Sequence, residues 1–228
     1  MSTKQDADQV RQAYVDAMGP ELGNIYFNLW NECAYLHCKW KEYRTLFGTN
    51  SERIAVLNRA AGTFFGIVQR TLWDDILLHI CRLTDPPRSV GKDNLTVTRL
   101  PQMVDEKIKA EIQTLLDECI ANCRFAQDRR KRRIAHSDLH LAIGHPDAAP
   151  LTPTSRKSVE KGLATVANLL NAIELHYTAS TVMYNVPTIE NAKSLLYVIR
   201  DGLLAEENRK KRVRSGNHEP GDISPTPL

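Results

Sequence analysis

Apolar residues recur at alternating three- and four-residue steps along several stretches of the chain, a spacing typical of one face of an amphipathic α-helix. The longest uninterrupted stripe consists of Leu22, Tyr26, Leu29, Cys33, Leu36, Trp40, Tyr43 and Phe47. A second stripe extends from Ile54 to Leu83 and stops before Pro86, because proline cannot continue a helix. The pattern therefore predicts two long helices joined by a tight turn, that is, an antiparallel helical hairpin.

Further helical patterns are present over residues 104–126, 159–177 and about 188–203. The long interruption between Thr84 and Met103 contains three prolines and the strand-like run Asn94 to Leu100, and we interpret it as a covering loop, or lid. We predict an all-α, antiparallel helical bundle with this long loop between helices and a disordered basic C-terminal tail. Residues 1–207 form the expected helical domain, and residues 208–228 the flexible tail.

The composition is that of an ordinary globular protein, with 42% hydrophobic and 25% charged residues in 228. No apolar run approaches the roughly 18 residues that span a bilayer, and the N-terminal residues are too polar for a signal peptide. Five cysteines make an odd number in a chain that is long enough to form a core without disulfides. We therefore expect a cytoplasmic protein that does not contact a membrane.

The sequence offers little support for a metal or cofactor site. Cys33, His37 and Cys38 lie close together, but Cys33 belongs to an apolar stripe and no second pair with zinc-ligand spacing exists. A Gly-rich phosphate loop, a nucleophile elbow and a metalloprotease motif are also absent from the sequence. We expect neither a metal nor a cofactor.

Positive charge is concentrated in two short segments, although the whole chain carries only +3. Residues 124–133 and residues 209–214 each have a net charge of +5, which leaves −7 for the remainder. Such concentrated charge on an acidic body is typical of a local polyanion site, whereas the alternative is a solvated charge run. The second segment either steers a polyanion to the protein or is only a solubilising end.

The first basic segment continues into a histidine, in the order DRRKRRIAHSD from Asp128 to Asp138. Arg130 lies in line with the apolar stripe of its helix, and five residues separate it from His136. On an unbroken helix these two would be about 120° apart around the axis. Either the helix bends here, or Arg129, Arg132 or Arg133 is the arginine that pairs with His136.

This segment resembles the Arg-x(4–6)-His motif of the HEPN superfamily, and the wider sequence is similar to the abortive-infection U-type branch from about Leu22 to Asp138. The similarity includes the sequences WKEYRTLF from Trp40, RLTD from Arg82, NLT from Asn94 and RIAHSDL from Arg133. Lys131 departs from the family, which more often has a short polar residue after the arginine.

The resemblance implies a metal-independent endoribonuclease in antiphage defence or a toxin–antitoxin system. Arg130 and His136 are then the catalytic residues at a homodimer cleft, and Asp138 is a possible support. The remaining basic residues, Arg129, Lys131, Arg132 and Arg133, would bind RNA phosphates. An antitoxin or another defence protein is a further possible partner.

Two other interpretations stay open at this point. The basic face could belong to a non-catalytic HEPN module that binds RNA, a nucleotide or a partner protein, or the helices could serve only as a scaffold. His136 could also simply cap the helix end. Arg82 and Asp85 are interpreted as an ion pair or a helix-end contact rather than as catalytic groups.

Overall fold

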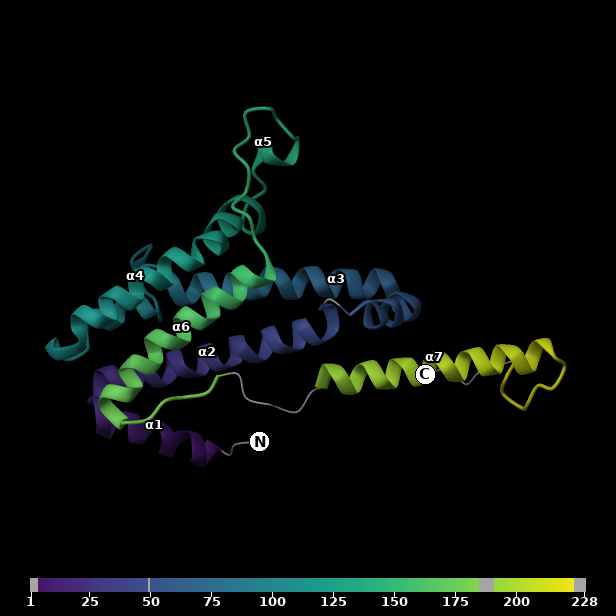
Figure 1. Cartoon of the computed structure of the whole chain (residues 1–228), viewed down its shortest axis with the longest axis horizontal. Coiled ribbons are helices and arrows are strands. Elements are labelled where there is room, and N and C mark those ends of the chain that lie inside the picture. The colour runs from purple at the N-terminus through teal and green to yellow at the C-terminus, as the bar shows by residue number, and fades with distance from the viewer. Residues whose placement is uncertain (1–3, 49, 185–190, 224–228) are drawn as a thin grey trace. The chain divides into compact units, whose positions relative to one another are not determined.

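The computed structural model describes residues 4–48, 50–184 and 191–223 of the chain (Figure 1). Within these residues the secondary structure is almost entirely helical, and its strands are limited to the short pair β1 (Arg88–Ser89) and β2 (Lys92–Asp93). The predicted all-α fold is therefore confirmed. The chain forms two compact units, Met1–Lys39 with Trp73–Val186 and Trp40–Leu72 with Pro187–Leu228, which we describe one at a time.

The first unit contains most of the helices. They are α1 (Lys4–Met18), most of α2 (Pro20–Phe47), the end of α3 (Ser51–Thr84), α4 (Glu106–Arg129), the short α5 (Leu139–Ala142) and α6 (Arg156–Thr178). All eight residues of the stripe predicted for α2 are 6% exposed or less, which confirms that this face is buried. α1 was not predicted, because only a few apolar residues such as Tyr14 and Met18 mark its buried side.

α4 and α6 lie side by side in this unit (Figure 1). Gly162 of α6 permits their close approach, since a Cβ atom there would lie 3.3 Å from the Sγ atom of Cys123. Ser155 begins α6 with a capping box that it shares with Ser158, which satisfies backbone N–H groups at the helix start. Apolar residues of both helices, among them Ile112 and Leu170, are completely buried between the elements of this unit.

Only the second part of the segment predicted to be a lid is firmly packed, since residues 86–93 are exposed. The run from Asn94 to Leu100 is not a strand, since Val97–Gln102 forms the 3₁₀-helix η1, and Val97 and Leu100 are fully buried. The buried Thr96 hydroxyl lies 2.8 Å from each of the Leu83 and Asp85 carbonyl oxygens. These contacts hold Thr96 against the end of α3, and η1 lies against α4.

The second unit contains the last turns of α2, the first part of α3 and α7 (Asn191–Arg214). The backbone leaves helical geometry at Ala61, where φ is −163° and ψ is 68°, so α3 is kinked. Beyond the kink Phe64 is 59% exposed, and the expectation of one continuously buried stripe along α3 is wrong there. The start expected for the last helix, near residue 188, lies outside the described residues.

α7 continues further than the sequence pattern indicates. The basic residues 209–214 were expected in a flexible tail beginning at 208, but they form the last turns of this helix. Ion pairs one turn apart, Glu206 with Lys210 and Glu207 with Lys211, support those turns. None of the described helices combines the length and apolar character required to cross a membrane.

Candidate functional site

The basic segment begins where regular α-helical geometry ends. α4 passes at Arg130 into a π-helical turn, η2 (Arg130–Ile134), in which the Ala135 amide donates to the Arg130 carbonyl oxygen at 2.9 Å. π-Helical turns are rare in proteins, and those that occur often lie at functional sites. Because the helix is not regular through this segment and His136 follows its end, the 120° separation calculated for an unbroken helix does not apply.

A carboxylate holds the guanidinium of Arg130. Its Nη1 donates to both carboxylate oxygens of Asp85, at 2.7 and 2.8 Å, and Gln127 Nε2 donates to the same carboxylate at 3.1 Å. The hydrogen bonds and the charge of Asp85 raise the pKa of Arg130, although burial opposes the shift. Arg130 is therefore a fixed, partly shielded cation.

Hydrogen bonds to its backbone carbonyl oxygen hold Asp85 in place. It follows the last residue of α3, and its carbonyl oxygen accepts hydrogen bonds from the hydroxyls of Thr96 and Thr98 at 2.8 and 2.9 Å. Asp85 does form an ion pair, as interpreted from the sequence, but with Arg130, whereas Arg82 is exposed. The end of α3, the start of η1 and the end of α4 thus meet at Asp85, whose carbonyl oxygen binds the threonines and whose carboxylate binds Arg130.

A groove lies beside this ion pair in the first unit. Its volume is about 320 Å³, and it is lined by Glu32, Arg82, Leu83, Asp85, Asn94 and Leu95. The groove presents an arginine, an amide and two carboxylates. A ligand there would meet mixed polar groups, and Asp85, one of its lining residues, also binds Arg130.

Arg132, also in the basic segment, contacts Asp138 and the loop that follows α5. Its Nε donates to Asp138 at 3.1 Å, and its terminal nitrogens donate to the carbonyl oxygens of Ala149 and Pro150. The backbone amide of Leu141 and the side chain of Arg132 lower the pKa of Asp138. Arg132 and Asp138 therefore join η2 to the loop that follows α5, and Arg132 is occupied by structural contacts.

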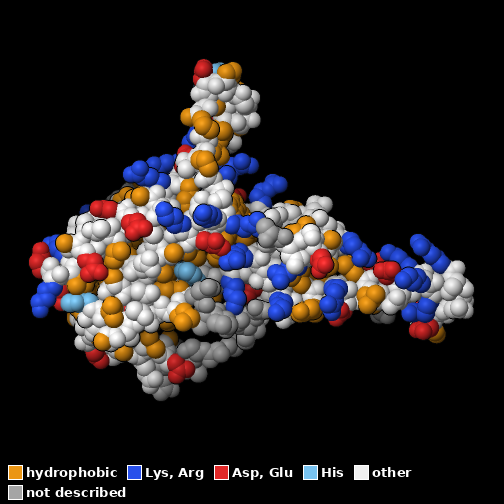
Figure 2. Space-filling model, viewed as in Figure 1, with side chains coloured by type: hydrophobic (Ala, Val, Ile, Leu, Met, Phe, Trp, Pro, Cys, Tyr) orange, Lys and Arg blue, Asp and Glu red, His pale blue; other side chains and the backbone are white. Residues whose placement is uncertain are grey.

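The remaining predicted residues divide into two groups. Arg129 Nε donates to the Thr154 hydroxyl at 2.8 Å and helps to anchor the start of α6. Lys131, Arg133 and His136 are exposed, and none of them makes a hydrogen bond or ion pair with another described residue. In Figure 2, Lys and Arg side chains gather where the projecting α5 segment joins the body of its unit. Among the residues predicted to bind RNA, the exposed cations are therefore Lys131 and Arg133.

Arg130 and His136 lie on one short segment, but no hydrogen bond joins them in the described structure. Gln127 and Thr154 were not predicted as supporting residues. Gln127 precedes Arg130 by less than one turn, and this proximity was the only sequence signal available. Thr154 lies 25 residues from Arg129, so nothing local marked their contact.

The described chain has an all-α fold in which the segment from Arg130 to His136 follows the end of the long helix α4. The family model HEPN_AbiU2, described as AbiU2, matches residues 19–197, most of the chain, and the protein belongs to this family. The resemblance found in the sequence is confirmed, and the match continues beyond Asp138 through α6 into α7. Comparisons with curated proteins and with solved structures gave no match.

Proposed function

We propose that this HEPN protein is a metal-independent endoribonuclease that uses Arg130 and His136. The observation that supports the proposal is the placement of an exposed histidine shortly after a basic π-helical turn whose first arginine is held by the carboxylate of Asp85. Exposure makes the imidazole accessible to a large substrate. Rigid support of Arg130 favours the preorganisation that electrostatic stabilisation of a transition state requires.

The reaction assigns a distinct role to each group. His136 accepts the proton of a ribose 2′-hydroxyl as its oxygen attacks the adjacent phosphorus. The bond to the 5′-oxygen breaks, and that oxygen takes up a proton from an acid. The products are a 2′,3′-cyclic phosphate and a 5′-hydroxyl end, while Arg130 stabilises the charge on the phosphoryl oxygens. Lys131 and Arg133 bind neighbouring phosphates.

The same proposal includes a homodimer in the cytoplasm. One copy of the motif supplies a single histidine, whereas the reaction uses both a base and an acid. A two-fold axis beside the segment would bring the second His136 into the same cleft. Activity of this kind also requires restraint in the cell, so we propose that an antitoxin or another defence protein contacts the chain.

One observation favours a second candidate, a HEPN module that binds RNA, a nucleotide or a partner protein without cleaving RNA. Asp85 already neutralises Arg130, with two contacts shorter than 3 Å. A phosphate would have to compete with this carboxylate, which weakens the arginine as an electrophilic catalyst. Lys131 and Arg133 would still attract a polyanion in such a module.

Cleavage of labelled RNA and matched DNA in the presence of a chelator separates the two candidates. We expect cleavage of RNA alone, cyclic phosphate ends, and a loss of at least about 100-fold in rate in His136→Ala, because general acid–base catalysis contributes about 10²–10⁴-fold. His218→Ala, which removes an exposed histidine of the other unit, is the matched control and should cleave normally. RNA binding without cleavage in the unaltered protein would identify the binding module instead.

The dimer is tested by light scattering coupled to size-exclusion chromatography. We expect twice the chain mass of 25.8 kDa at the concentrations at which RNA is cleaved. Dilution that dissociates the dimer should abolish cleavage, because each monomer retains only one His136. Full activity of a protein shown to be monomeric would contradict the two-motif mechanism.

A further inference from the structure

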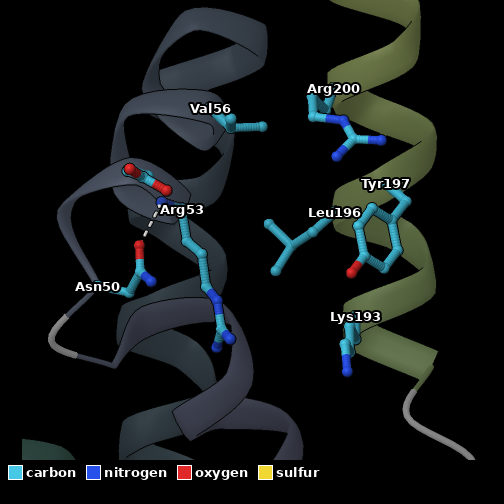
Figure 3. Close-up of a pocket in the computed structure, with 8 residues that line it drawn as sticks. Asn50, Arg53, Val56, Lys193, Leu196, Tyr197 and Arg200 are labelled. Atoms are coloured by element: carbon cyan, nitrogen blue, oxygen red, sulfur yellow. Dashed lines mark hydrogen bonds between the residues drawn. The ribbon is translucent and has the colours of Figure 1, made fainter.

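The pocket of the second unit does not bring its charged side chains together. It has a volume of about 180 Å³ and lies between the first part of α3 and α7 (Figure 3). The guanidinium groups of Arg53 and Arg200 lie at opposite ends of the pocket, and Arg200 pairs with Asp201. These two cations therefore do not form a common site.

A cluster of oxygen atoms in the first unit does converge, and it surrounds the carboxylate of Glu174. This residue belongs to α6 and is only 4% exposed. Its Oε1 atom lies 3.3 Å from the hydroxyl of Tyr14, 3.2 Å from that of Thr178 and 3.4 Å from that of Ser180. Hydroxyl groups of α1, of the end of α6 and of the residues that follow α6 thus meet at one buried carboxylate.

These hydroxyl groups do not satisfy the carboxylate, because most of their protons are used elsewhere. All three contacts with Oε1 are longer than the roughly 2.7–2.8 Å that is usual between hydroxyl and acceptor oxygen atoms. The Thr178 hydroxyl donates to the Glu174 carbonyl oxygen at 2.8 Å, so the Ser180 hydroxyl, 2.8 Å from that of Thr178, donates to Thr178. The Tyr26 hydroxyl, also near Glu174, donates to the Leu170 carbonyl oxygen at 3.2 Å. The cluster therefore has more acceptors than donors.

The other carboxylate oxygen of Glu174, Oε2, is buried and has no hydrogen-bond partner among the described residues. Buried polar atoms without a partner are rare in proteins, and each calls for an explanation. A proton on Oε2 would itself find no acceptor, so protonation does not satisfy this atom. A positively charged ligand would satisfy both oxygen atoms of the carboxylate.

The negative charge of Glu174 also lacks a counter-charge. No lysine, arginine or histidine in the described part of the chain makes an ion pair with it. Glu174 lies one turn before the end of α6, where the helix dipole is negative and disfavours a further negative charge. Burial and the charge of Glu174 raise the pKa of Tyr14, so that phenol is neutral. A buried carboxylate in these surroundings is costly unless a cation compensates it.

We propose that Glu174 and the surrounding hydroxyl groups bind a monovalent alkali metal cation, Na⁺ or K⁺. Hard cations take oxygen ligands, and the cluster offers carboxylate and hydroxyl oxygen atoms. One carboxylate balances one positive charge. The described residues contain no group of three or more His, Cys, Asp or Glu suited to a metal ion, which argues against a transition metal. Ser180 is exposed, so the ion can enter from its side of the cluster.

Thermal unfolding of the full chain, followed by circular dichroism, tests the site at constant ionic strength as NaCl or KCl replaces N-methylglucamine chloride. We expect the melting temperature to rise by at least about 3 °C in one of the two salts, because an ion that binds only the folded state stabilises it. A preference for either ion supports the site and identifies its ligand. Equal melting temperatures in all three salts, or a response to Ca²⁺ alone, would overturn the proposal.

Variants locate the binding. Glu174→Gln should abolish the cation response, since the amide keeps the shape of the side chain and removes its charge. Ser180→Ala, which alters only an exposed side chain, should increase several-fold the cation concentration required for half of the response. Glu111→Gln removes an exposed carboxylate of α4 and should respond as the unaltered protein does. An unchanged response in Glu174→Gln, or an equal loss in Glu111→Gln, would refute this site.

Sodium NMR measures the binding directly. The protein should broaden the Na⁺ signal, and the broadening should be lost in Glu174→Gln and persist in Glu111→Gln. Equal broadening by the two variants would contradict a site at Glu174.

The result does not depend on the proposed ribonuclease activity, because the ion takes no part in the cleavage reaction. His136→Ala should keep the full cation response of the melting temperature. Loss of the response in that variant would place the effect at the basic segment and contradict the site at Glu174.

Discussion

At the residue scale, the contact that most determines the site is the ion pair between Asp85 and Arg130. The two side chains are only 19% and 27% exposed, so water screens their interaction less than it screens an ordinary surface pair. Gln127 donates to the same carboxylate, and the Asp85 carbonyl oxygen accepts from two threonines. Removing the charge at Asp85 would therefore disturb several elements together.

Asp85→Asn should lower the free energy of unfolding by roughly 1–3 kcal/mol, because a partly buried Arg130 loses its partner. Urea denaturation of the two proteins measures the change. The matched control is Asp93→Asn, which disrupts another Asp–Arg pair, with Arg99, in which the carboxylate is 78% exposed. That change should stay within about 0.5 kcal/mol. Equal effects of the two substitutions would show that the Asp85 contact contributes no more to the free energy of unfolding than an exposed ion pair does.

At the element scale, the packing of α1 against the start of α2 depends on one glycine. A Cβ atom at Gly23 would lie 2.5 Å from the Tyr14 carbonyl oxygen and 2.6 Å from the Val15 Cα atom. Both neighbours are backbone atoms, so no side-chain rotation can relieve the overlap. α1 can occupy its place only because residue 23 has no side chain.

Gly23→Ala should therefore displace α1 and lower the free energy of unfolding by roughly 1–3 kcal/mol, the usual cost of overpacking. The comparison is Gly202→Ala in α7, where no atom lies within 4 Å of the added Cβ. That variant should be neutral or more stable by up to about 1 kcal/mol, because alanine favours the helix. Thermal unfolding followed by circular dichroism measures both, and an unchanged melting temperature in Gly23→Ala would contradict the close contact.

At the scale of the whole molecule, buried histidines couple stability to pH. His79 is 1% exposed, and burial together with the charge of Lys39 lowers its pKa to about 4, although its Nε2 atom lies 2.7 Å from Glu32. Burial also lowers the pKa of His37. Both histidines stay neutral in the folded protein at pH values at which the unfolded chain binds protons, since the ordinary pKa is about 6.5.

Stability should consequently fall as the pH decreases from about 6.5 to about 4, by roughly 2–3 kcal/mol for His79. The unfolded state binds more protons than the folded state throughout that pH window, so the free energy of unfolding decreases as the pH falls. Carboxylates with a lowered pKa, such as Asp128 and Asp138, add their losses only below about pH 4. Denaturation from pH 4.5 to 7.5 should show a smaller slope in His79→Gln and an unchanged slope in His218→Ala. Equal slopes in all three proteins would exclude this role of His79.

The sequence predicted the elements best where one periodic stripe extends over many turns. The α2 stripe from Leu22 to Phe47 is buried as its spacing indicated, since helical periodicity depends on local geometry alone. The prediction was incomplete at α1, where few apolar residues reveal the buried side, and wrong in α3, which is kinked at Ala61 and leaves Phe64 exposed. Residues 94–100 combine strand-like composition with a 3₁₀-helix, because Thr96 contacts the end of α3 and η1 lies against α4.

The sequence by itself determined the all-α class, the HEPN resemblance and the basic segment that ends in His136. Only the tertiary structure decided that Arg130 is bound to Asp85, 45 residues away, and that Arg132 is taken up by Asp138 and two loop carbonyls. Spacing along a chain specifies which residues share a helix face. It does not specify which helix ends meet, because that choice depends on the burial of the whole core and on the hydrogen bonds that long-range packing permits.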